Sequence, residues 1–411
     1  MCNFITIHLK NTFLIVLVSL FSLGSCQSQK NEKTPQAKTL KTAEDNFIIV
    51  GANQLNEYLP LLQKKKIGVV ANQTSVIFNK QGHTHLVDSL LSLQVSVKKV
   101  FAPEHGFRGK ADAGEHITSG KDAKTGVDIV SIYGKNKKPS IEQLNDLDLI
   151  IFDIQDVGAR FYTYISSLHY VMEACAENNI PLLILDRPNP NGHYIDGPTL
   201  EPEYKSFVGM HPIPVVHGMT IGEYALMING QQWLNNGIQC AITIISCKNY
   251  TKNKTYSLPI KPSPNLPNDA AINLYPSLCF FEGTNVSVGR GTEKQFQLFG
   301  SPFLNKTEFF FIPKPNEGAK HPKHENKICY GFDLSNHESL KQLNLEWLIK
   351  AYKQSSNDDS KFWNNFFTKL AGTKNLQKQI ISGISAEEIR ASWQNDLRNY
   401  NQMRKAYLLY E

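Results

Sequence analysis

Six apolar runs recur between residues 66 and 247, and a polar turn follows each of them. The runs lack the two-residue alternation of a half-exposed strand. Continuous apolar character is typical of strands that are buried on both faces of a parallel sheet. The pattern therefore predicts six strands, at residues 66–73, 97–106, 127–134, 147–156, 180–189 and 240–247.

Helical patterns separate several of these strands, at residues 82–93, 162–179 and 220–237. The last pattern begins with Thr220 and has Glu223 three residues later, which is the spacing of a capping box. Because strands and helices alternate, we predict a doubly wound α/β domain with a mostly parallel sheet over residues 47–254.

Residues 255–411 have a different pattern, which predicts a smaller α+β domain at the C-terminus. A proline-rich stretch opens it, and Ser385 with Glu388 gives its last helix a capping-box start. The aromatic residues Trp363 and Phe366 suit the core of a helical region better than a ligand site. The predicted elements are a strand at 327–334 and helices at 339–354 and 385–410.

The N-terminal residues predict export and attachment to a membrane. Lys10 precedes an apolar stretch at 12–23 that is too short for a comfortable membrane span, and Leu23-Gly24-Ser25-Cys26 resembles a bacterial lipobox. We expect residues 1–25 to be a lipoprotein signal peptide and Cys26 to carry the lipid. An ordinary signal peptide with an incidental cysteine is the alternative.

Residues 26–46 are polar and have no apolar period, so we expect a flexible tether. The folded part would then begin near residue 47, outside the cytoplasm. The expected location is the bacterial cell envelope, where the lipid on Cys26 would attach the protein to a membrane. The sequence does not distinguish a periplasmic position from one at the outer-membrane face.

Composition excludes some classes of protein. The 411 residues are 41% hydrophobic, which is enough for a large core, and the length favours two domains. The net charge of +6 comes without a dense Lys/Arg run, so we expect no nucleic-acid partner. Five cysteines beyond Cys26 show no C-x-x-C or ligand-like spacing and predict buried free thiols, with one disulfide as the alternative. They are Cys175, Cys240, Cys247, Cys279 and Cys329.

Polar residues lie at the carboxyl ends of four of the predicted strands or just beyond them. Ligands of doubly wound sheets bind beyond the carboxyl ends of the strands, so this edge is the predicted site. An isolated Asn or Asp there is more often a cap or turn residue, but four coincidences at one edge favour a site. The residues are Asn72 and Gln73, Glu104 and His105, Asp153, Gln155, Asp156 and Arg160, and Asp186, Arg187, Asn189 and Asn191.

Several common motifs are missing from the sequence. The first strand leads into neither G-x-G-x-x-G nor a P-loop, and no G-x-S-x-G occurs, so we expect no nucleotide cofactor and no serine nucleophile of that type. His83 and His85 lie two apart in a predicted helix and would point to different faces. His105 with Asp153 or Asp156 could hold a metal, but we favour hydrogen bonding and predict no metal.

Carboxylate chemistry is the remaining possibility, and Glu104 is its best candidate. Glu104 lies in the turn FAPEHGFRG, between a proline and two glycines. A carboxyl group withdrawn from water has a raised pKa and can act as a general acid near neutral pH. A second group must position water or stabilise the transition state, and Asp153, Asp156 and Glu282 are the candidates. Two alternatives stay open: Asp156 as an ion-pair partner of Arg160, and Glu282 as a capping residue.

Five motifs occur in one order along the chain: PEHGFRG (103–109), DIQDVGARFYTY (153–164), LDRPNPNG (185–192), PSPNLP (262–267) and EGTNVSVGRGT (282–292). Together they resemble the bacterial exo-β-N-acetylmuramidase family of the NamZ type. The resemblance implies a Rossmann-like catalytic domain and a smaller C-terminal domain that completes the cleft. It also implies an exo-acting glycosidase that releases terminal β-1,4-linked N-acetylmuramic acid from the non-reducing end of peptidoglycan fragments.

The resemblance also implies roles for individual residues. The acidic residue of the PEHG motif is Glu104, which the residue pattern also favours. We assign the remaining catalytic positions to His105, Asp153 and Asp156. The residues expected to bind substrate are Asn72, Arg108, Gln155, Arg160, Asp186, Arg187, Asn265, Glu282, Thr284, Asn285 and Arg290.

One of the arginines is expected to recognise the substrate by binding its carboxylate. Muramic acid carries a lactyl carboxylate, and a guanidinium can grip a carboxylate through two parallel hydrogen bonds. The residue responsible would be Arg108, Arg160, Arg187 or Arg290. Two other classes remain open: a surface-anchored carbohydrate-binding protein without catalysis, and a metal-dependent hydrolase that uses His105 and Asp153.

Overall fold

The computed structural model describes residues 47–109, 115, 119–355 and 359–411. The described residues form one compact unit. The predicted signal peptide, the lipidation site Cys26 and the tether at 26–46 lie outside the described residues. In the described part, no helix has the length and apolar character needed to cross a membrane.

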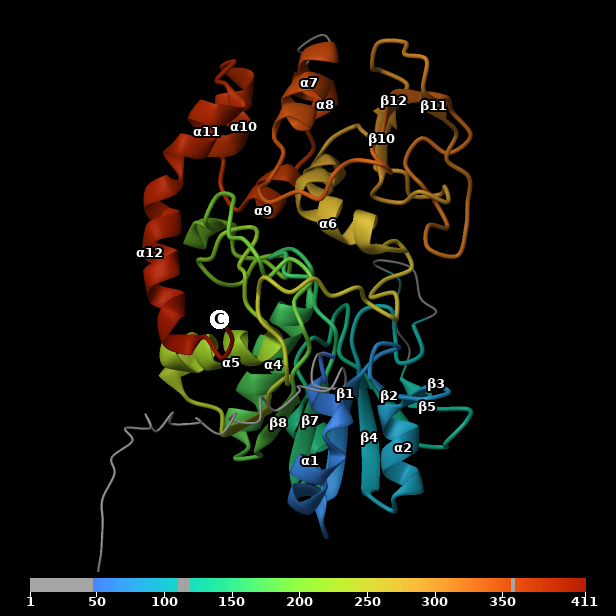
Figure 1. Ribbon diagram of the computed structural model, residues 1–411, viewed down its shortest axis with the longest axis vertical. Helices are drawn as coiled ribbons and strands as arrows, with labels where there is room; N and C mark the ends of the chain where they lie inside the picture. The colour runs from blue at the N-terminus through green and yellow to red at the C-terminus, as the bar shows by residue number, and fades with distance from the viewer. Residues whose placement is uncertain (1–46, 110–114, 116–118, 356–358) are drawn as a thin grey trace, which may run out of the picture. The chain divides into compact units, whose positions relative to one another are not determined.

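All six predicted strands occur, and they form most of a seven-stranded sheet in the order β5-β6-β4-β1-β7-β8-β9 (Figure 1). Six strands are parallel, and only β5 at the edge is antiparallel. The parallel strands follow the 3-2-1-4-5-6 order of the Rossmann fold. The strands are β1 (Lys66–Ala71), β4 (Ser96–Ala102), β5 (Gly120–Lys121), β6 (Asp128–Ser131), β7 (Leu149–Asp153), β8 (Leu182–Leu185) and β9 (Ile242–Ile245).

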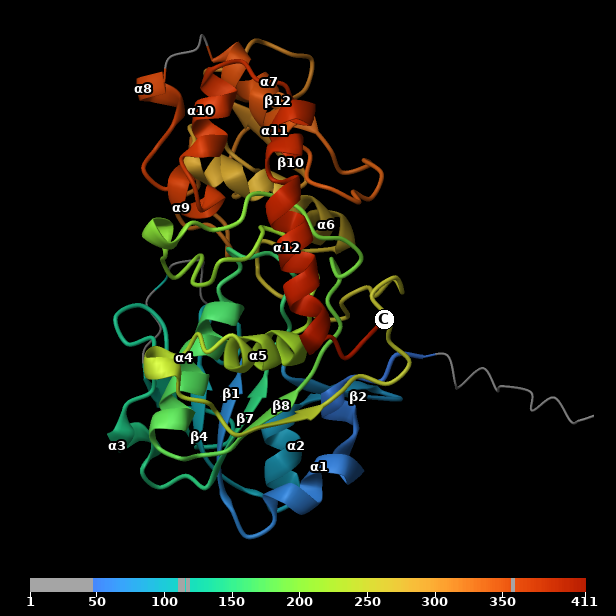
Figure 2. The same cartoon turned by 90° about the vertical axis from the view of Figure 1, so that its left-hand side faces the viewer.

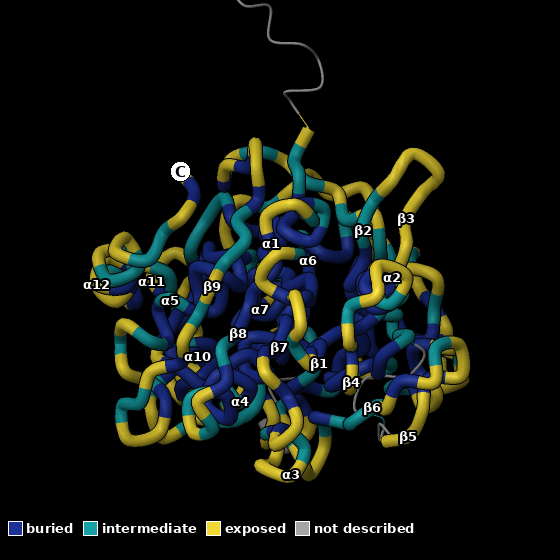
Figure 3. Tube along the Cα trace, turned by 90° about the horizontal axis from the view of Figure 1, so that it is seen from below, coloured by how far each residue is buried: buried dark blue, intermediate teal, exposed yellow. Residues whose placement is uncertain are grey.

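Helices cover both faces of this sheet, which explains the continuous apolar runs. Val69 and Ile151 pack with α1 and α2 on one face, whereas Val70 and Phe152 pack with α4 and α5 on the other. Figure 3 shows β1, β7 and β8 buried near the centre and exposed segments around them. The helices are α1 (Leu55–Leu62), α2 (Leu86–Ser92), α3 (Ile141–Leu144), α4 (Tyr164–Glu177) and α5 (Ile221–Gly230).

The start of α5 confirms the predicted capping box. Thr220 Oγ1 accepts a hydrogen bond from the Glu223 amide at 3.3 Å, and the Glu223 carboxylate accepts one from the Thr220 amide at 2.9 Å. These bonds satisfy two of the amides that a helix leaves unpaired at its N-terminus.

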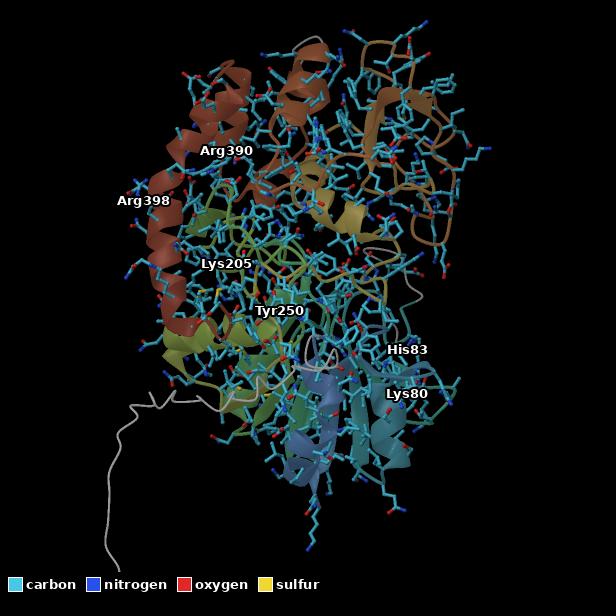
Figure 4. The ribbon with its side chains drawn as sticks, viewed as in Figure 1. Lys80, His83, Lys205, Tyr250, Arg390 and Arg398 are labelled. Carbon is cyan, nitrogen blue, oxygen red and sulfur yellow. The ribbon has the colours of Figure 1, made fainter. Side chains whose placement is uncertain are left out.

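The helix predicted at 82–93 is wrong in its first third. β2 (Val76–Asn79) and β3 (Gly82–His85) form an antiparallel hairpin, and α2 begins only at Leu86. Gly82 has φ +126°, a conformation that suits glycine and closes the turn. His83 is exposed on this hairpin (Figure 4), whereas both ring nitrogens of His85 have partners, the Asn72 carbonyl and the Val87 amide.

The C-terminal half contains the predicted strand as the centre of a small antiparallel sheet, in the order β10-β12-β11. Its long helix predicted at 385–410 is broken near the buried Trp393, whose indole donates to Asp196 at 3.1 Å. The elements are α6 (Asp269–Leu278), β10 (Leu298–Ser301), β11 (Phe310–Phe311), β12 (Cys329–Asp333), α7 (Glu346–Gln354), α8 (Asp359–Phe362), α9 (Phe367–Ala371), α10 (Asn375–Ile381), α11 (Ala386–Ser392) and α12 (Gln394–Arg404).

The end of the chain returns to the N-terminal half, where α12 descends to α5 (Figures 1 and 2). Arg404 donates to the Gly218 carbonyl at 2.8 Å, and the Tyr410 hydroxyl donates to the Asp186 carboxylate at 2.7 Å.

The five cysteines 175, 240, 247, 279 and 329 are buried and free, as predicted. Short 3-10 turns occur at Gly51–Asn53, Pro202–Tyr204, Asn235–Gly237, Cys279–Gly283 and Lys405–Tyr407.

Candidate active site

A pocket of about 320 Å³ lies where the loops after β4, β6 and β7 meet α6 and the 3-10 turn that follows it. It lies within the compact unit, and both halves of the chain contribute to its wall. Its lining contains polar side chains and several aromatic rings. The polar lining residues include Glu104, His105, Tyr133, Thr163, Asn265, Glu282 and Arg290.

Glu104 is held by two hydroxyl groups. Tyr133 donates to Oε1 at 2.9 Å, and Thr163 donates to Oε2 at 2.7 Å. A hydroxyl group can also accept a hydrogen bond, so the same neighbours can serve a protonated or an ionised Glu104. This carboxyl group is therefore positioned at both of its oxygens.

The backbone around Glu104 has an unusual conformation. The Gly106 amide donates to the Pro103 carbonyl at 3.0 Å, and His105, at the second central position of this turn, has φ +69°. Residues other than glycine seldom adopt that conformation. The turn buries His105, which is 4% exposed, and leaves Glu104 partly exposed at the pocket.

Glu282 and Arg290 form an ion pair in the part of the lining that the C-terminal half supplies, with Arg290 Nε 3.2 Å from Glu282 Oε1. Burial opposes ionisation of Glu282, but the charges of Arg290 and Lys323 outweigh it and hold the pKa of Glu282 below its ordinary value. Glu282 is thus a carboxylate at neutral pH. The Arg290 guanidinium lies over the Phe296 ring at 5.0 Å and makes no other hydrogen bond to a described side chain.

Aromatic and apolar side chains complete the pocket. Phe161, Tyr162, Tyr275 and Phe296 line it and are largely buried. Phe366, which we predicted as core, is 38% exposed and lines the pocket, because it precedes α9 instead of lying inside a packed helix. Sugars present both hydroxyl groups and apolar C–H faces, and this lining matches both.

Asp153 and Arg187 bind each other and do not line the pocket. Arg187 Nε lies 2.6 Å from Oδ1, and Nη2 lies 2.9 Å from Oδ2, in a bidentate pair whose side chains are 2% and 0% exposed. Burial raises the pKa of Asp153, although the charge of Arg187 opposes this. The pair lies at the β1/β7 switch point, where Rossmann-like proteins commonly bind ligands. In this protein the side chains of Asp153 and Arg187 occupy the switch point.

Arg108 and Arg160 also lie outside the pocket lining. Arg108 pairs with Asp122 at 2.8 Å and Asp88 at 3.1 Å. Arg160 is fully buried and does not pair with Asp156; its two terminal nitrogens donate to four carbonyl oxygens at 2.7 to 2.8 Å, and burial lowers its pKa to about 9. Those carbonyls belong to Pro198, Ile213, Leu370 and Ala371, so Arg160 joins the two halves of the chain.

The other polar residues at this edge of the sheet make hydrogen bonds to other groups of the protein. The amide of Asn72 donates to Tyr164 at 2.8 Å, and the amide of Gln155 donates to the Pro188 carbonyl at 2.7 Å. Asp156 Oδ2 accepts from the Gly158 amide at 2.7 Å. Asp186 accepts from Thr220, Gly222 and Tyr410, and burial raises its pKa to about 6.

Of the C-terminal candidates, Asn265 joins Glu282 and Arg290 in the pocket lining, whereas Thr284 and Asn285 do not. Asn265 is 1% exposed and donates to the Gly318 carbonyl at 2.6 Å. Thr284 donates to the Phe281 carbonyl at 2.9 Å, and Asn285 donates to the Lys361 carbonyl at 2.9 Å. Both therefore shape the turn that carries Glu282.

The metal-dependent alternative loses its proposed ligand pair, because Arg187 occupies both oxygens of Asp153. Across the described ranges, no group of three or more His, Cys, Asp and Glu side chains is arranged to hold a metal ion.

Sequence reasoning missed Tyr133 and Thr163, the two residues that position Glu104. Tyr133 lies at the carboxyl end of the third predicted strand, so the rule that selected the other edge residues could have selected it. Thr163 lies within a quoted motif, but a threonine ahead of a helix is more often a cap. Phe207, which also lines the pocket, lies in a loop without a sequence signal.

The fold and the pocket define a class of protein: a Rossmann-like α/β protein whose pocket carries one carboxyl group from each half of the chain. A pair of carboxyl groups is the usual arrangement for glycoside hydrolysis. The sequence matches the family described as "Exo-beta-N-acetylmuramidase NamZ, N-terminal" over residues 67–270 and its C-terminal counterpart over residues 273–410. The chain therefore belongs to the exo-β-N-acetylmuramidase NamZ family, a family of glycosidases, as the resemblance predicted.

Similar proteins cover the chain almost completely. The peptidoglycan β-N-acetylmuramidase NamZ of Bacillus subtilis (strain 168) is 36% identical, over 98% of this chain and 100% of that protein. Crystal structures of two DUF1343 family proteins from Bacteroides fragilis NCTC 9343 superpose with TM-scores of 0.82 and 0.76, at 48% and 26% identity. Each covers 89% of this chain and 99% of its own.

Proposed function

We propose that this protein removes terminal β-1,4-linked N-acetylmuramic acid from the non-reducing end of peptidoglycan fragments, with Glu104 as the general acid. The observation that carries the proposal is the position of Glu104, which lies in a pocket shared with Glu282 and Arg290 and is hydrogen-bonded at both oxygens. The activity of the Bacillus subtilis relative supports the substrate class.

In this mechanism Glu104 protonates the glycosidic oxygen as the bond to the sugar breaks. Tyr133 and Thr163 keep the carboxyl group in place during the transfer, because each hydroxyl can switch between donor and acceptor. Glu282 remains ionised, so its negative charge can stabilise the positive charge that develops on the sugar ring. Water then adds to the anomeric carbon in place of the departing oxygen, and the proton that this water loses restores the acid form of Glu104 by the end of the cycle.

Arg290 is the residue proposed to bind the lactyl carboxylate of muramic acid. Of the four arginines considered, it is the one that lines the pocket, and its guanidinium has donors beyond the Nε that contacts Glu282. A charge-assisted bond to a carboxylate is stronger than a bond to the neutral hydroxyl that N-acetylglucosamine carries at the same position.

The test compares two leaving groups with the full chain in detergent. Glu104→Gln should lower kcat/KM about 10²- to 10⁴-fold on a MurNAc–GlcNAc disaccharide, whose alcohol leaving group needs a proton. The loss should be smaller on para-nitrophenyl β-N-acetylmuramide, because nitrophenolate leaves without protonation. The exposed Glu308 provides the matched control, Glu308→Gln, which should behave as wild type.

Equal losses on both substrates would remove the general-acid role from Glu104. A folded wild-type protein that binds muramic acid but hydrolyses neither substrate would favour the rival hypothesis, a surface-anchored protein that binds carbohydrate without catalysis.

The proposed setting of this activity is the bacterial cell envelope, with lipid on Cys26. The lipobox-like sequence and the polar segment at 26–46 support it. Replacing Cys26 by serine should move the expressed protein from the membrane fraction to the soluble fraction, as followed by immunoblot. Unchanged membrane association would contradict the anchor.

A further inference from the structure

One lysine side chain holds the turn that carries Glu282. Lys323 Nζ donates to three carbonyl oxygens, those of Phe281 at 3.1 Å, Thr284 at 2.6 Å and Val286 at 3.1 Å. Lys323 does not line the pocket, and the proposed mechanism gives it no part. Because these oxygens lie on both sides of Glu282 in the sequence, one side chain fixes the backbone before and after it.

The three acceptors around Lys323 match the charged form of its side chain. An ammonium group has three N–H donors, and a neutral amine has fewer. Burial lowers the pKa of Lys323, but the negative charge of Glu282 opposes this. Lys323 therefore places a positive charge beside the turn that carries Glu282.

The loop that carries Lys323 also contacts the turn that carries Arg290. The Lys314 amide donates to the Gly291 carbonyl at 2.8 Å. Gly291 has φ +78°, and a Cβ atom there would lie 2.7 Å from the ring of Pro322. Pro322 thus packs directly on this turn, and the loop contacts the segments that carry both members of the ion pair in the pocket.

Several titratable groups surround the Glu282 carboxylate. Arg290 pairs with it at 3.2 Å, and Lys323 adds a second positive charge; together they hold the pKa of Glu282 below its ordinary value, although burial opposes them. The Cys279 thiol, one turn earlier, stays neutral at pH 7, because burial and the charge of Glu282 raise its pKa. Glu104 is the other carboxyl group of the pocket lining. Without Lys323, only Arg290 would oppose the effect of burial.

We propose that Lys323 is a positioning residue for the hydrolysis: it fixes the turn that carries Glu282 and keeps the Glu282 carboxylate negatively charged. This inference rests on the proposed function, which places that negative charge beside the positive sugar ring of the transition state. Lys323 would act through Glu282 and would not touch the substrate, because carbonyl oxygens of the protein occupy its donors.

The test measures kcat/KM for para-nitrophenyl β-N-acetylmuramide between pH 4 and pH 8, with the full chain in detergent. This leaving group depends little on Glu104, so the fall in rate on the acid side reports the ionisation of Glu282 and of the substrate, and the substrate is the same for every variant. Lys323→Met removes the charge and the donors, whereas Lys323→Gln removes the charge and keeps two donors. Lys327, exposed on the same loop, provides the matched control, Lys327→Met.

Both uncharged variants should move the acid side of the pH profile upward by about one pH unit, because the carboxylate loses a nearby opposite charge. Their loss relative to wild type should therefore be about three- to tenfold larger at pH 4.5 than at pH 7. At pH 7 Lys323→Met should lose about tenfold, because the turn is no longer held, and Lys323→Gln should lose less. Lys323→Arg keeps the charge, so its profile should keep the wild-type position even where its rate is lower. Lys327→Met should match wild type throughout.

Circular dichroism shows which variants fold, and Lys323→Gln decides the test if Lys323→Met does not. An acid limb at the wild-type position in the uncharged variants would overturn the inference, whether the rate is unchanged or is lowered equally at every pH. Loss of folding in every Lys323 variant would also overturn it, because the residue would then serve the fold and not the hydrolysis. Each of these results leaves the proposed function intact, whereas a wild-type protein that does not hydrolyse the muramide would overturn both.

Discussion

Asp153→Asn should destabilise the fold severely, because Asp153 is the sole carboxylate paired with the buried Arg187 in the described structure. The substitution keeps the shape of the side chain but removes its charge and one of two hydrogen-bond acceptors. Both groups are essentially inaccessible to water, so the guanidinium would remain charged and half-partnered. Breaking such a pair from one side costs about 3–5 kcal/mol in the free energy of unfolding.

A double-mutant cycle with Arg187→Met isolates the interaction. The single variant Arg187→Met leaves Asp153 buried without its counter-charge, and a carboxylate can escape that cost by taking up a proton. The pKa of Asp153 is then raised further above its value in the unfolded chain, so the loss of stability should shrink as the pH falls. The double variant Asp153→Asn with Arg187→Met buries no charge and should lose much less than the two single losses combined.

Urea unfolding at pH 7 and pH 5, followed by tryptophan fluorescence, measures these free energies, and hydrolysis of the muramide is measured beside it. A loss below about 1 kcal/mol for Asp153→Asn, together with abolished hydrolysis, would refute the reasoning. Asp153 would then act in the chemistry, as its position in the sequence first suggested. Glu104→Gln is the comparison, since it should lower disaccharide hydrolysis about 10²- to 10⁴-fold while the protein remains folded.

Two further predictions concern single side chains. Arg290→Met should weaken binding of free N-acetylmuramic acid about tenfold by calorimetry and leave the weaker binding of N-acetylglucosamine unchanged, and a tenfold change costs about 1.4 kcal/mol; equal weakening for both sugars would contradict the assignment. Burial raises the pKa of Asp186 to about 6 from an ordinary 3.8, so its stabilising contribution is present below the lower value and is lost as the pH rises through the higher one. Between pH 4 and pH 7 the wild-type free energy of unfolding should fall by about 2 kcal/mol relative to Asp186→Asn, and parallel pH profiles would show that Asp186 is not the titrating group.

The strands were predictable because each carries its own signal. Residues such as Ile150 and Ile151 are buried on opposite faces of the sheet, so the apolar run needs no knowledge of its neighbours. The hairpin at 76–85 was not predictable in the same way, since its second strand, Gly82–His85, is largely exposed and polar and is stabilised by pairing with the first. Edge strands of two residues, such as Gly120–Lys121, carry no periodic signal at all.

The sequence predicted where the site lies better than it predicted which residues line it. Chain order brings Glu104, Asp153 and Arg187 to one edge of the sheet, and the sequence shows that much. Whether a polar side chain faces a pocket or a partner depends on contacts between residues far apart in sequence, such as the 34 positions that separate Asp153 from Arg187. Patterns along the chain do not contain that information.

The side chains at the switch point still serve the pocket, although they do not line it. The amide of Asn72 donates to the hydroxyl of Tyr164, and that hydroxyl lies 3.4 Å from the carbonyl oxygen of Glu104. Asn72 is in turn fixed by the hydroxyl and amide of Thr74. A chain of hydrogen bonds, buried except for the last one, thus leads from the centre of the sheet to the backbone of the turn that carries Glu104. In many Rossmann-like proteins this point holds a ligand; here it is filled with internal bonds that fix the turn carrying Glu104, and the ligand pocket is displaced toward β4 and β6.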